Sequence, residues 1–345
     1  MTNTRPTRSI LAAGLGALLA AVAVQPLAAA EPASCKTVRF GDVGWTDIAA
    51  TTGAVTAVLR GLGYETSVTI SSVPIVFVGM KTKSLDVFLG NWMPTMESMV
   101  RPHLDDGSVE LVRANLEGAK YTLAVPGYLA EAGLKDFGDI AKFKDQLDGK
   151  IHGIEAGNDG NLIIEKMIKE NAFGLGGYTL VESSEAGMLG EVKRAARGKK
   201  PVVFLGWEPH PMNTTLQMTY LTGGDDWFGP NLGGATVHTN VRKGYRAECP
   251  NVGKLLENAA FSLTMENEIM GAILDDRQEP EAAARAWLAK NPAVLETWLA
   301  GGVTTFDGQP ALPAVTAHLG KQGCGSRGRG AAPLPRRRPV RPPCR

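Results

Sequence analysis

Two stretches of this sequence, FLGNWMP at 88–94 and FLGWEP at 204–209, are versions of one phrase in which an apolar run is followed by a tryptophan and a proline. Each stretch closes a longer pattern, over 38–94 and over 150–209, in which short apolar segments alternate with amphipathic ones. Short strands that alternate with helices form parallel α/β sheets. The repeat therefore predicts two similar lobes, each a mostly parallel sheet flanked by helices.

The expected elements follow the same order in both units. The first unit has expected strands at 38–40, 66–70 and 86–90, a helix at 48–62, and a second helix that begins after Ser72 as its cap. The second unit has expected strands at 150–154, at 178–181 and from 202, and helices at 158–173 and 185–197. The second unit is inserted whole between segments of the first. We therefore expect one lobe over 31–123 and 237–320 and the other over 124–236.

Four aromatic residues are expected near a cleft between the lobes. Ligands of open parallel sheets bind beyond the carboxyl ends of the strands, and Trp92 and Trp207 each lie at such an end, one per unit. Trp45 lies at a similar strand-to-helix turn, and Tyr121 lies in an expected strand, 120–125, that crosses between the lobes. A tryptophan at such an end can instead cap its own sheet, but the paired occurrence favours a shared cleft.

Asp47 and Asn158 stand where helices are expected to begin. Asp and Asn are preferred N-cap residues, so helix capping by itself accounts for both positions. A helix that follows a strand also begins at the edge of the sheet where the cleft lies. Capping and contact with a ligand therefore remain compatible.

Charge and motif content narrow the function. The 345-residue chain has a formal net charge of +1, but residues 1–30 contribute +2, residues 321–345 contribute +8, and residues 31–320 carry −9. An acidic body argues against a nucleic-acid partner, which requires a basic face. The sequence has no G-x-S-x-G elbow, Walker A loop, H-E-x-x-H motif or Cys/His cluster, so no catalytic residue, metal site or cofactor is predicted. Aromatic walls in an acidic protein suit a quaternary ammonium, which has no N–H to donate.

The first thirty residues have the features of a secretory signal. Arg5 and Arg8 precede an uncharged apolar run at 10–24, and three alanines at 28–30 follow. That run is shorter than the roughly 18–20 residues that span a bilayer, and the alanines form a cleavage site. We therefore expect cleavage after Ala30 and a periplasmic protein.

Export to an oxidising space bears on the cysteines. Cys35 and Cys249 lie in the body of the protein, and such a compartment favours a disulfide between them. Residues 321–345 combine eight Lys and Arg with many Pro and Gly, so they are expected to form a disordered tail.

Several longer motifs resemble the periplasmic choline-binding proteins of ABC importers. They lie at 44–47 (GWTD), 88–96, 118–123, 157–160, 204–212 and 223–226, and the likeness runs from about 35 to 319. The resemblance implies a two-lobed type II periplasmic-binding fold, the disulfide above, a monomer, and a membrane permease and ATPase as partners. It also implies a choline site with an aromatic cage and two polar partners: Trp45, Trp92, Tyr121 and Trp207, with Asp47 and Asn158. The basic tail departs from the family pattern.

Other functions remain open at this stage. A glycine betaine or proline betaine binder would share the fold and the cage but would have to satisfy a carboxylate, for which the cleft motifs offer no Arg. An enzyme acting on choline esters would need a nucleophile and a base beside the cage, and none is visible. A purely structural surface protein would leave the paired tryptophans unexplained. We expect a binding protein that prefers choline.

Overall fold

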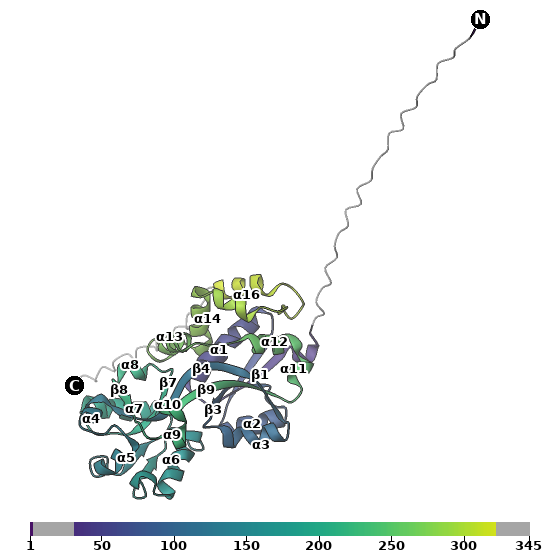
Figure 1. The fold of residues 1–345 in the computed structure, drawn as a ribbon. Coiled ribbons are helices and arrows are strands. Elements are labelled where there is room, and N and C mark those ends of the chain that lie inside the picture. Colours follow the sequence, from purple (N-terminus) through teal and green to yellow (C-terminus); the bar gives the residue numbers. More distant parts are fainter. Residues whose placement is uncertain (3–30, 322–345) are drawn as a thin grey trace, which may run out of the picture.

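The computed structural model describes residues 1–2 and 31–321 (Figure 1). Both predicted units are present, in the predicted order. The first comprises β1 (Thr37–Asp42), α1 (Thr46–Gly61), β2 (Glu65–Ile70), α2 (Val73–Lys81) and β3 (Val87–Met93), and the second comprises β5 (Lys150–His152), α6 (Asp159–Lys169), β6 (Thr179–Val181), α7 (Glu185–Arg197) and β7 (Phe204–Glu208). The predicted signal segment and nearly all of the predicted tail lie outside the described residues.

The two units share one nine-stranded sheet with the order β2-β1-β3-β9-β4-β7-β5-β6, and β8 (Met218–Tyr220) pairs with β4. The strands within each unit are parallel, whereas the long strands β4 (Val109–Pro126) and β9 (Gly234–Arg242) run antiparallel to their neighbours between the units. At Lys120, β4 passes from pairing with β9 to pairing with β7. The sheet is therefore divided into two parallel parts, which form two lobes.

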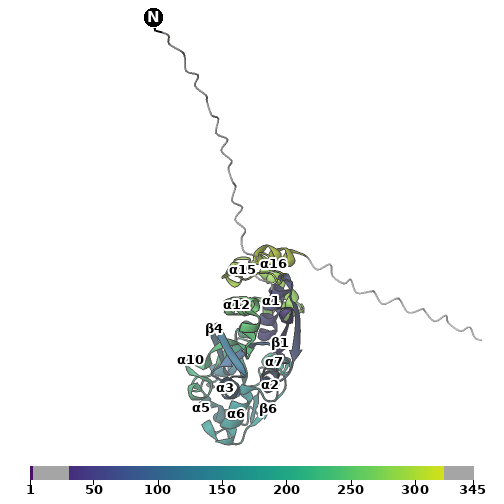
Figure 2. The same cartoon turned by 90° about the vertical axis from the view of Figure 1, so that its right-hand side faces the viewer.

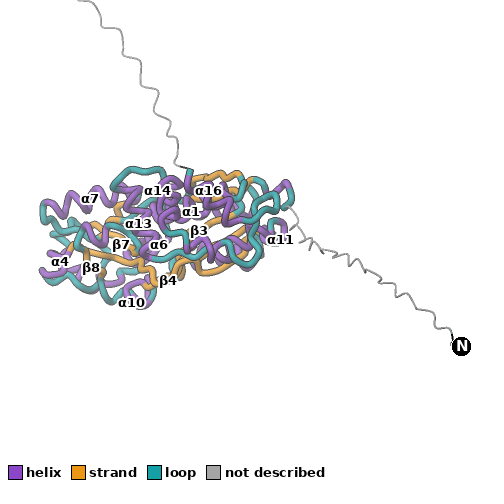
Figure 3. Tube along the Cα trace, turned by 90° about the horizontal axis from the view of Figure 1, so that it is seen from above, coloured by secondary structure: helices purple, strands orange, loops and turns teal. Residues whose placement is uncertain are grey.

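Helices cover both parts of the sheet. In the first lobe, α1 packs with the C-terminal helices on one face, while α2 and α3 (Glu97–Asp105) lie on the other (Figure 1). The remaining helices are α4 (Gly127–Glu131), α5 (Phe137–Ile140), α8 (Met212–Thr215), α9 (Asp225–Phe228), α10 (Pro230–Gly233), α11 (Tyr245–Glu248), α12 (Pro250–Asn258), α13 (Leu263–Leu274), α14 (Pro280–Lys290), α15 (Ala293–Trp298) and α16 (Ala311–Gly320). Figure 2 places α15 and α16 at one end of the molecule and α5 and α6 at the other. Figure 3 shows the elongated shape that results, with α7 and α11 toward opposite ends.

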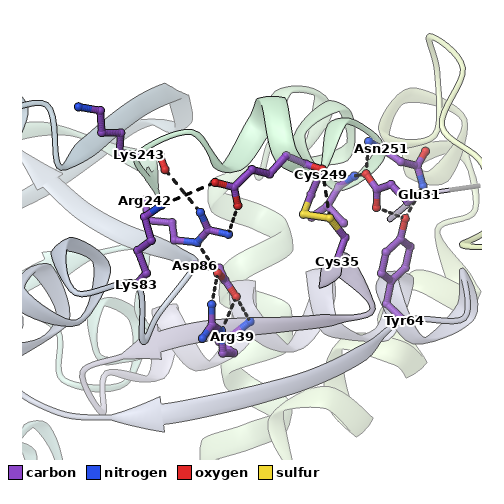
Figure 4. Close-up of a disulfide and its surroundings, with 12 residues drawn as sticks. Glu31, Cys35, Arg39, Tyr64, Lys83, Asp86, Arg242, Lys243, Cys249 and Asn251 are labelled. Atoms are coloured by element: carbon purple, nitrogen blue, oxygen red, sulfur yellow. Dashed lines mark hydrogen bonds and ion pairs between the residues drawn. A yellow bond between two sulfur atoms is a disulfide. The ribbon is translucent and has the colours of Figure 1, made fainter. Parts of the chain in front are cut away.

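The predicted disulfide between Cys35 and Cys249 is present, and it joins the segment before β1 to the start of α12 (Figure 4). Beside it, the Glu31 carboxylate accepts hydrogen bonds from the backbone N–H of Asn251 and from the hydroxyl of Tyr64. These contacts bind the segment just before β1 to a helix that lies more than two hundred residues later in the sequence.

In these two units, two boundary predictions fail and one capping prediction holds only in part. The helix expected over 158–173 ends at Lys169, because Asn171 and Phe173 have left-handed backbone angles that stop it. Ser72 occupies the N-cap position of α2, but its side chain makes no capping hydrogen bond. The strand expected to end at Gly90 continues to Met93, so Trp92 lies within β3 instead of just after it.

Candidate ligand-binding site

A cavity lies at the junction of the two lobes. Its lining consists of Trp45, Asp47, Trp92, Tyr121, Ile154, Asp159 and Trp207. The first three come from the first unit and the last three from the second, and Tyr121 lies on β4 directly opposite Trp207 on β7. Five of the six predicted site residues therefore meet around one cavity, although they are spread over more than 160 positions of the sequence.

The four aromatic rings form walls and do not stack on one another. The ring centroids of Trp92 and Tyr121 are 5.9 Å apart with an interplanar angle of 58°, and those of Tyr121 and Trp207 are 6.4 Å apart at 78°. All four side chains belong to buried residues. Rings set at steep angles around a small cavity can present several π faces to one ligand, which is the arrangement that binds a cation without N–H groups.

Two of the tryptophans are held in place by carboxylates. The Nε1–H of Trp92 donates to Oδ2 of Asp47 at 3.1 Å, and the Nε1–H of Trp45 donates to Oε1 of Glu155 at 2.9 Å. Glu155 lies in the loop between β5 and α6, so the second bond crosses from one lobe to the other. These bonds satisfy the polar edges of the indoles and fix the orientation of the rings.

Asp47 is expected from the sequence to stand at the N-cap of α1, but it does not cap this helix. It is the second residue of the helix, and Trp45 occupies the N-cap position. One carboxylate oxygen of Asp47 accepts the bond from Trp92, while Oδ1 is buried and has no hydrogen-bond partner. Burial, reinforced by repulsion from the nearby Glu185 carboxylate, raises the pKa of Asp47 to about 8. A buried acceptor without a partner is costly, so this oxygen is poised for a donor supplied by a ligand.

Asn158 caps α6 as predicted, and its Oδ1 accepts from the backbone N–H of Asn161 at 3.1 Å. The same oxygen accepts from the hydroxyl of Tyr121 at 2.8 Å, and the Asn158 amide donates to Oδ1 of Asp159 at 3.1 Å. Asn158 thus bonds to two residues of the cavity wall but is not itself part of that wall. It connects the cap of α6 to the cage.

Asp159 is a cavity residue that sequence reasoning missed. It follows the predicted Asn158 at the beginning of α6, within the Gly-Asn-Asp-Gly motif, and that adjacency was the signal available. Its Oδ2 is buried without a hydrogen-bond partner, and burial raises its pKa to about 6. The cavity therefore contains two carboxyl groups, one from each lobe, each with an unpaired oxygen.

The surroundings of the cavity are strongly acidic. Behind the two wall carboxylates lie Glu155 and Glu185, and burial together with repulsion from Asp47 raises the pKa of Glu266 on α13 well above its usual range. No Lys or Arg is among the residues that line the cavity. Such a site attracts positive charge and repels negative charge.

Within residues 1–2 and 31–321, no three or more His, Cys, Asp or Glu side chains are grouped so as to hold a metal ion. In the same residues, every helix is too short or too polar to span a bilayer.

A pocket between the lobes, walled by aromatic rings and two carboxylates, has the features of a binding site for a small cation. The chain matches, over residues 36–290, the family described as the substrate-binding domain of the ABC-type glycine betaine transport system. That match covers most of its length, and the chain belongs to this family.

Solved structures show the same fold. An ABC-transporter choline-binding protein in complex with choline is 62% identical, with a TM-score of 0.82, and the match covers 84% of this chain and all of that one. An ABC-transporter choline-binding protein in an unliganded semi-closed conformation is also 62% identical, with a TM-score of 0.77. That match covers 83% of this chain and 99% of the other. A lactococcal glycine betaine-binding protein, closed on glycine betaine, is 24% identical with a TM-score of 0.69, covers 76% of this chain and 99% of that one, and supports the two-lobed fold alone.

The curated proteins that match by sequence include two relatives. An uncharacterized protein of Chromohalobacter salexigens is 55% identical over 127 residues, which is 37% of this chain and 82% of that protein. The glycine betaine/carnitine transport binding protein of Listeria monocytogenes is 30% identical over 164 residues, which is 48% of this chain and about half of that protein.

Proposed function

We propose that this protein captures choline in the interlobe cavity and delivers it to the permease and ATPase of an ABC importer. The observation that carries the proposal is the combination of four aromatic walls with the unpaired Oδ1 of Asp47 in one cavity. The trimethylammonium group would contact the faces of Trp45, Trp92, Tyr121 and Trp207, each worth about 0.5–2 kcal/mol. The choline hydroxyl would donate to a carboxylate oxygen.

The proposal assigns roles to the two polar positions. Asp47 would accept the hydroxyl and add negative charge opposite the ammonium. Asn158 would support the polar end of the site through Tyr121 and Asp159, to which it is bonded. The protein would act by binding alone, in keeping with a family of transport substrate-binding domains.

We also propose how the lobes are divided and where the protein acts. One lobe would comprise 31–123 and 237–320 and the other 124–236, with the hinge where β4 and β9 cross between the parts of the sheet. A ligand that contacts both walls would shift the population toward the closed form. Substrate-binding proteins of this family act outside the cytoplasm. For this protein we propose a periplasmic location, reached after cleavage of the chain behind Ala30.

Glycine betaine is the second candidate, because the family description and the relative from Listeria monocytogenes name it. Its trimethylammonium group would fit the same cage. Its carboxylate, however, would lie against Asp47 and Asp159 without any Lys or Arg in the wall. Like charges in a low-dielectric cavity repel, so this arrangement disfavours the binding of glycine betaine.

Titration calorimetry with choline, acetylcholine, glycine betaine and carnitine tests the assignment. We expect choline to bind at least about tenfold more tightly than glycine betaine, a difference of about 1.4 kcal/mol. Equal affinity for the two would reject choline as the preferred ligand and would support the betaine alternative.

A further inference from the structure

Glu185 is a buried carboxylate that lies outside the cavity wall. It is the first residue of α7 in the second lobe, and only 5% of its surface is exposed. Its Oε2 accepts from the backbone N–H of Thr46 at 2.8 Å, and its Oε1 accepts from the Thr46 hydroxyl. Thr46 begins α1 in the first lobe, so both bonds cross the junction between the lobes.

His210 holds the same carboxylate from its own lobe. Its Nε2 lies 3.2 Å from Oε1 of Glu185, and its Nδ1 accepts from the backbone N–H of Met212 at 2.9 Å. Because Nδ1 is an acceptor, the proton of the neutral ring is on Nε2 and is donated to Glu185. The ring of His210 also packs edge-on against Trp207, with centroids 5.1 Å apart. The carboxylate is therefore oriented by a residue that touches the cage.

The position of Thr46 explains why this contact matters for binding. Thr46 lies between Trp45 and Asp47, which both line the cavity. The first N–H groups of a helix have no partner within it, and Trp45, at the N-cap, supplies none from its side chain. Glu185 provides the missing acceptor from the opposite lobe, and a negative charge is favourable at a helix N-terminus.

We propose that Glu185 is an interlobe latch: a positioning residue that caps α1 across the junction and so holds Trp45 and Asp47 in place when the lobes close. The inference rests on the proposed function as a choline-binding protein. The latch bonds join protein to protein, so they stabilise the closed form whether or not a ligand is present. They break when the lobes open to release ligand, and they are not yet formed when ligand enters the open form. The latch therefore slows release more than it affects capture.

The test uses the mature full-length protein with Glu185→Ala, Thr46→Val, Thr46→Ser and, as a control on the same helix, Glu191→Gln. Glu191 is a partly exposed residue that pairs with Arg194 of its own helix. Stopped-flow tryptophan fluorescence gives the association and release rates of choline. Small-angle scattering of the empty protein gives its radius of gyration.

We expect Glu185→Ala to release choline about tenfold faster, with association changed less than about twofold, and to increase the radius of gyration of the empty protein. Thr46→Val removes only the hydroxyl donor and should speed release about threefold, whereas Thr46→Ser and Glu191→Gln should match wild type. If Glu185 served only to stabilise its own lobe, its replacement would lower the melting temperature. It would not speed release of choline more than it changes association.

Unchanged release in Glu185→Ala, with Trp207→Ala still weakening choline, would overturn the latch and leave the choline assignment intact. If Glu185→Ala does not fold, Thr46→Val decides: faster release supports the latch, and wild-type release rejects it. A wild-type protein that binds no choline would instead overturn the proposed function.

Discussion

Replacing Asp47 by Asn should change both the affinity for choline and its dependence on pH. The carboxyl group accepts from Trp92 through one oxygen and offers the other, buried and unpaired, to the cavity. Asn can keep the bond to Trp92 but removes the negative charge beside the ammonium. A hydrogen bond to a charged group contributes about 1.5–3 kcal/mol and a neutral one about 0.5–1.5 kcal/mol. We therefore expect choline to bind roughly five- to thirtyfold more weakly.

The sign of the pH effect follows from the raised pKa. With a pKa of about 8, Asp47 is mostly protonated in the empty protein at pH 6, because it is buried and lies near the Glu185 carboxylate. A cation favours the ionised form, so binding must release this proton below pH 8. One pKa unit corresponds to about 1.36 kcal/mol. Lowering the pH from 8 to 6 should therefore weaken choline binding by up to about a hundredfold. Affinity should rise from pH 6 to pH 8 and then level off.

The assay is calorimetry of choline binding between pH 5.5 and 8.5 in buffers of different ionisation enthalpy, which counts the protons released. In Asp47→Asn, the rise between pH 6 and 8 should disappear. The empty variant should also melt at a higher temperature than wild type at pH 7.5, because ionised Asp47 is disfavoured in the folded state, and this gain should shrink as the pH falls toward 4. A wild-type affinity that is the same at pH 6 and pH 8, with no proton release, would refute the reasoning.

Three further predictions concern the cage, the second carboxylate and the disulfide. Trp207→Ala should weaken choline binding strongly, and Trp207→Phe should weaken it less because Phe keeps a π face. Trp287→Phe should lower the melting temperature with little effect on choline affinity in calorimetry. Unchanged affinity in Trp207→Ala would argue against the cage. Asp159→Asn should flatten the pH profile only near and below pH 6, and a loss of the rise between pH 6 and 8 would contradict its assigned pKa. Removing the disulfide with Cys35→Ser and Cys249→Ser should cost about 2–5 kcal/mol in chemical denaturation and leave choline affinity unchanged; a large fall in affinity would show that the bond shapes the cavity.

Local pattern predicted much of the site. The alternation of strands and helices located both units, and the carboxyl ends of their strands located Trp45, Trp92 and Trp207, because in a parallel sheet such ends meet at one edge. The capping role of Asn158 was also predictable, since it depends on the backbone within three residues of it. The same local rule failed for Asp47, whose carboxylate bonds to an indole 45 positions away.

The sequence by itself determined that this protein has two α/β units with aromatic residues at corresponding strand ends, because strand periodicity and helix signals act over a few residues. Only the tertiary structure decided that Asp159 belongs to the cavity wall, that Glu155 fixes Trp45, and that Glu185 caps α1. Each of these depends on side chains brought together from different elements, and two of the contacts join residues more than a hundred positions apart. Their approach is set by the crossing of β4 and β9 between the lobes, which no pattern in either unit encodes.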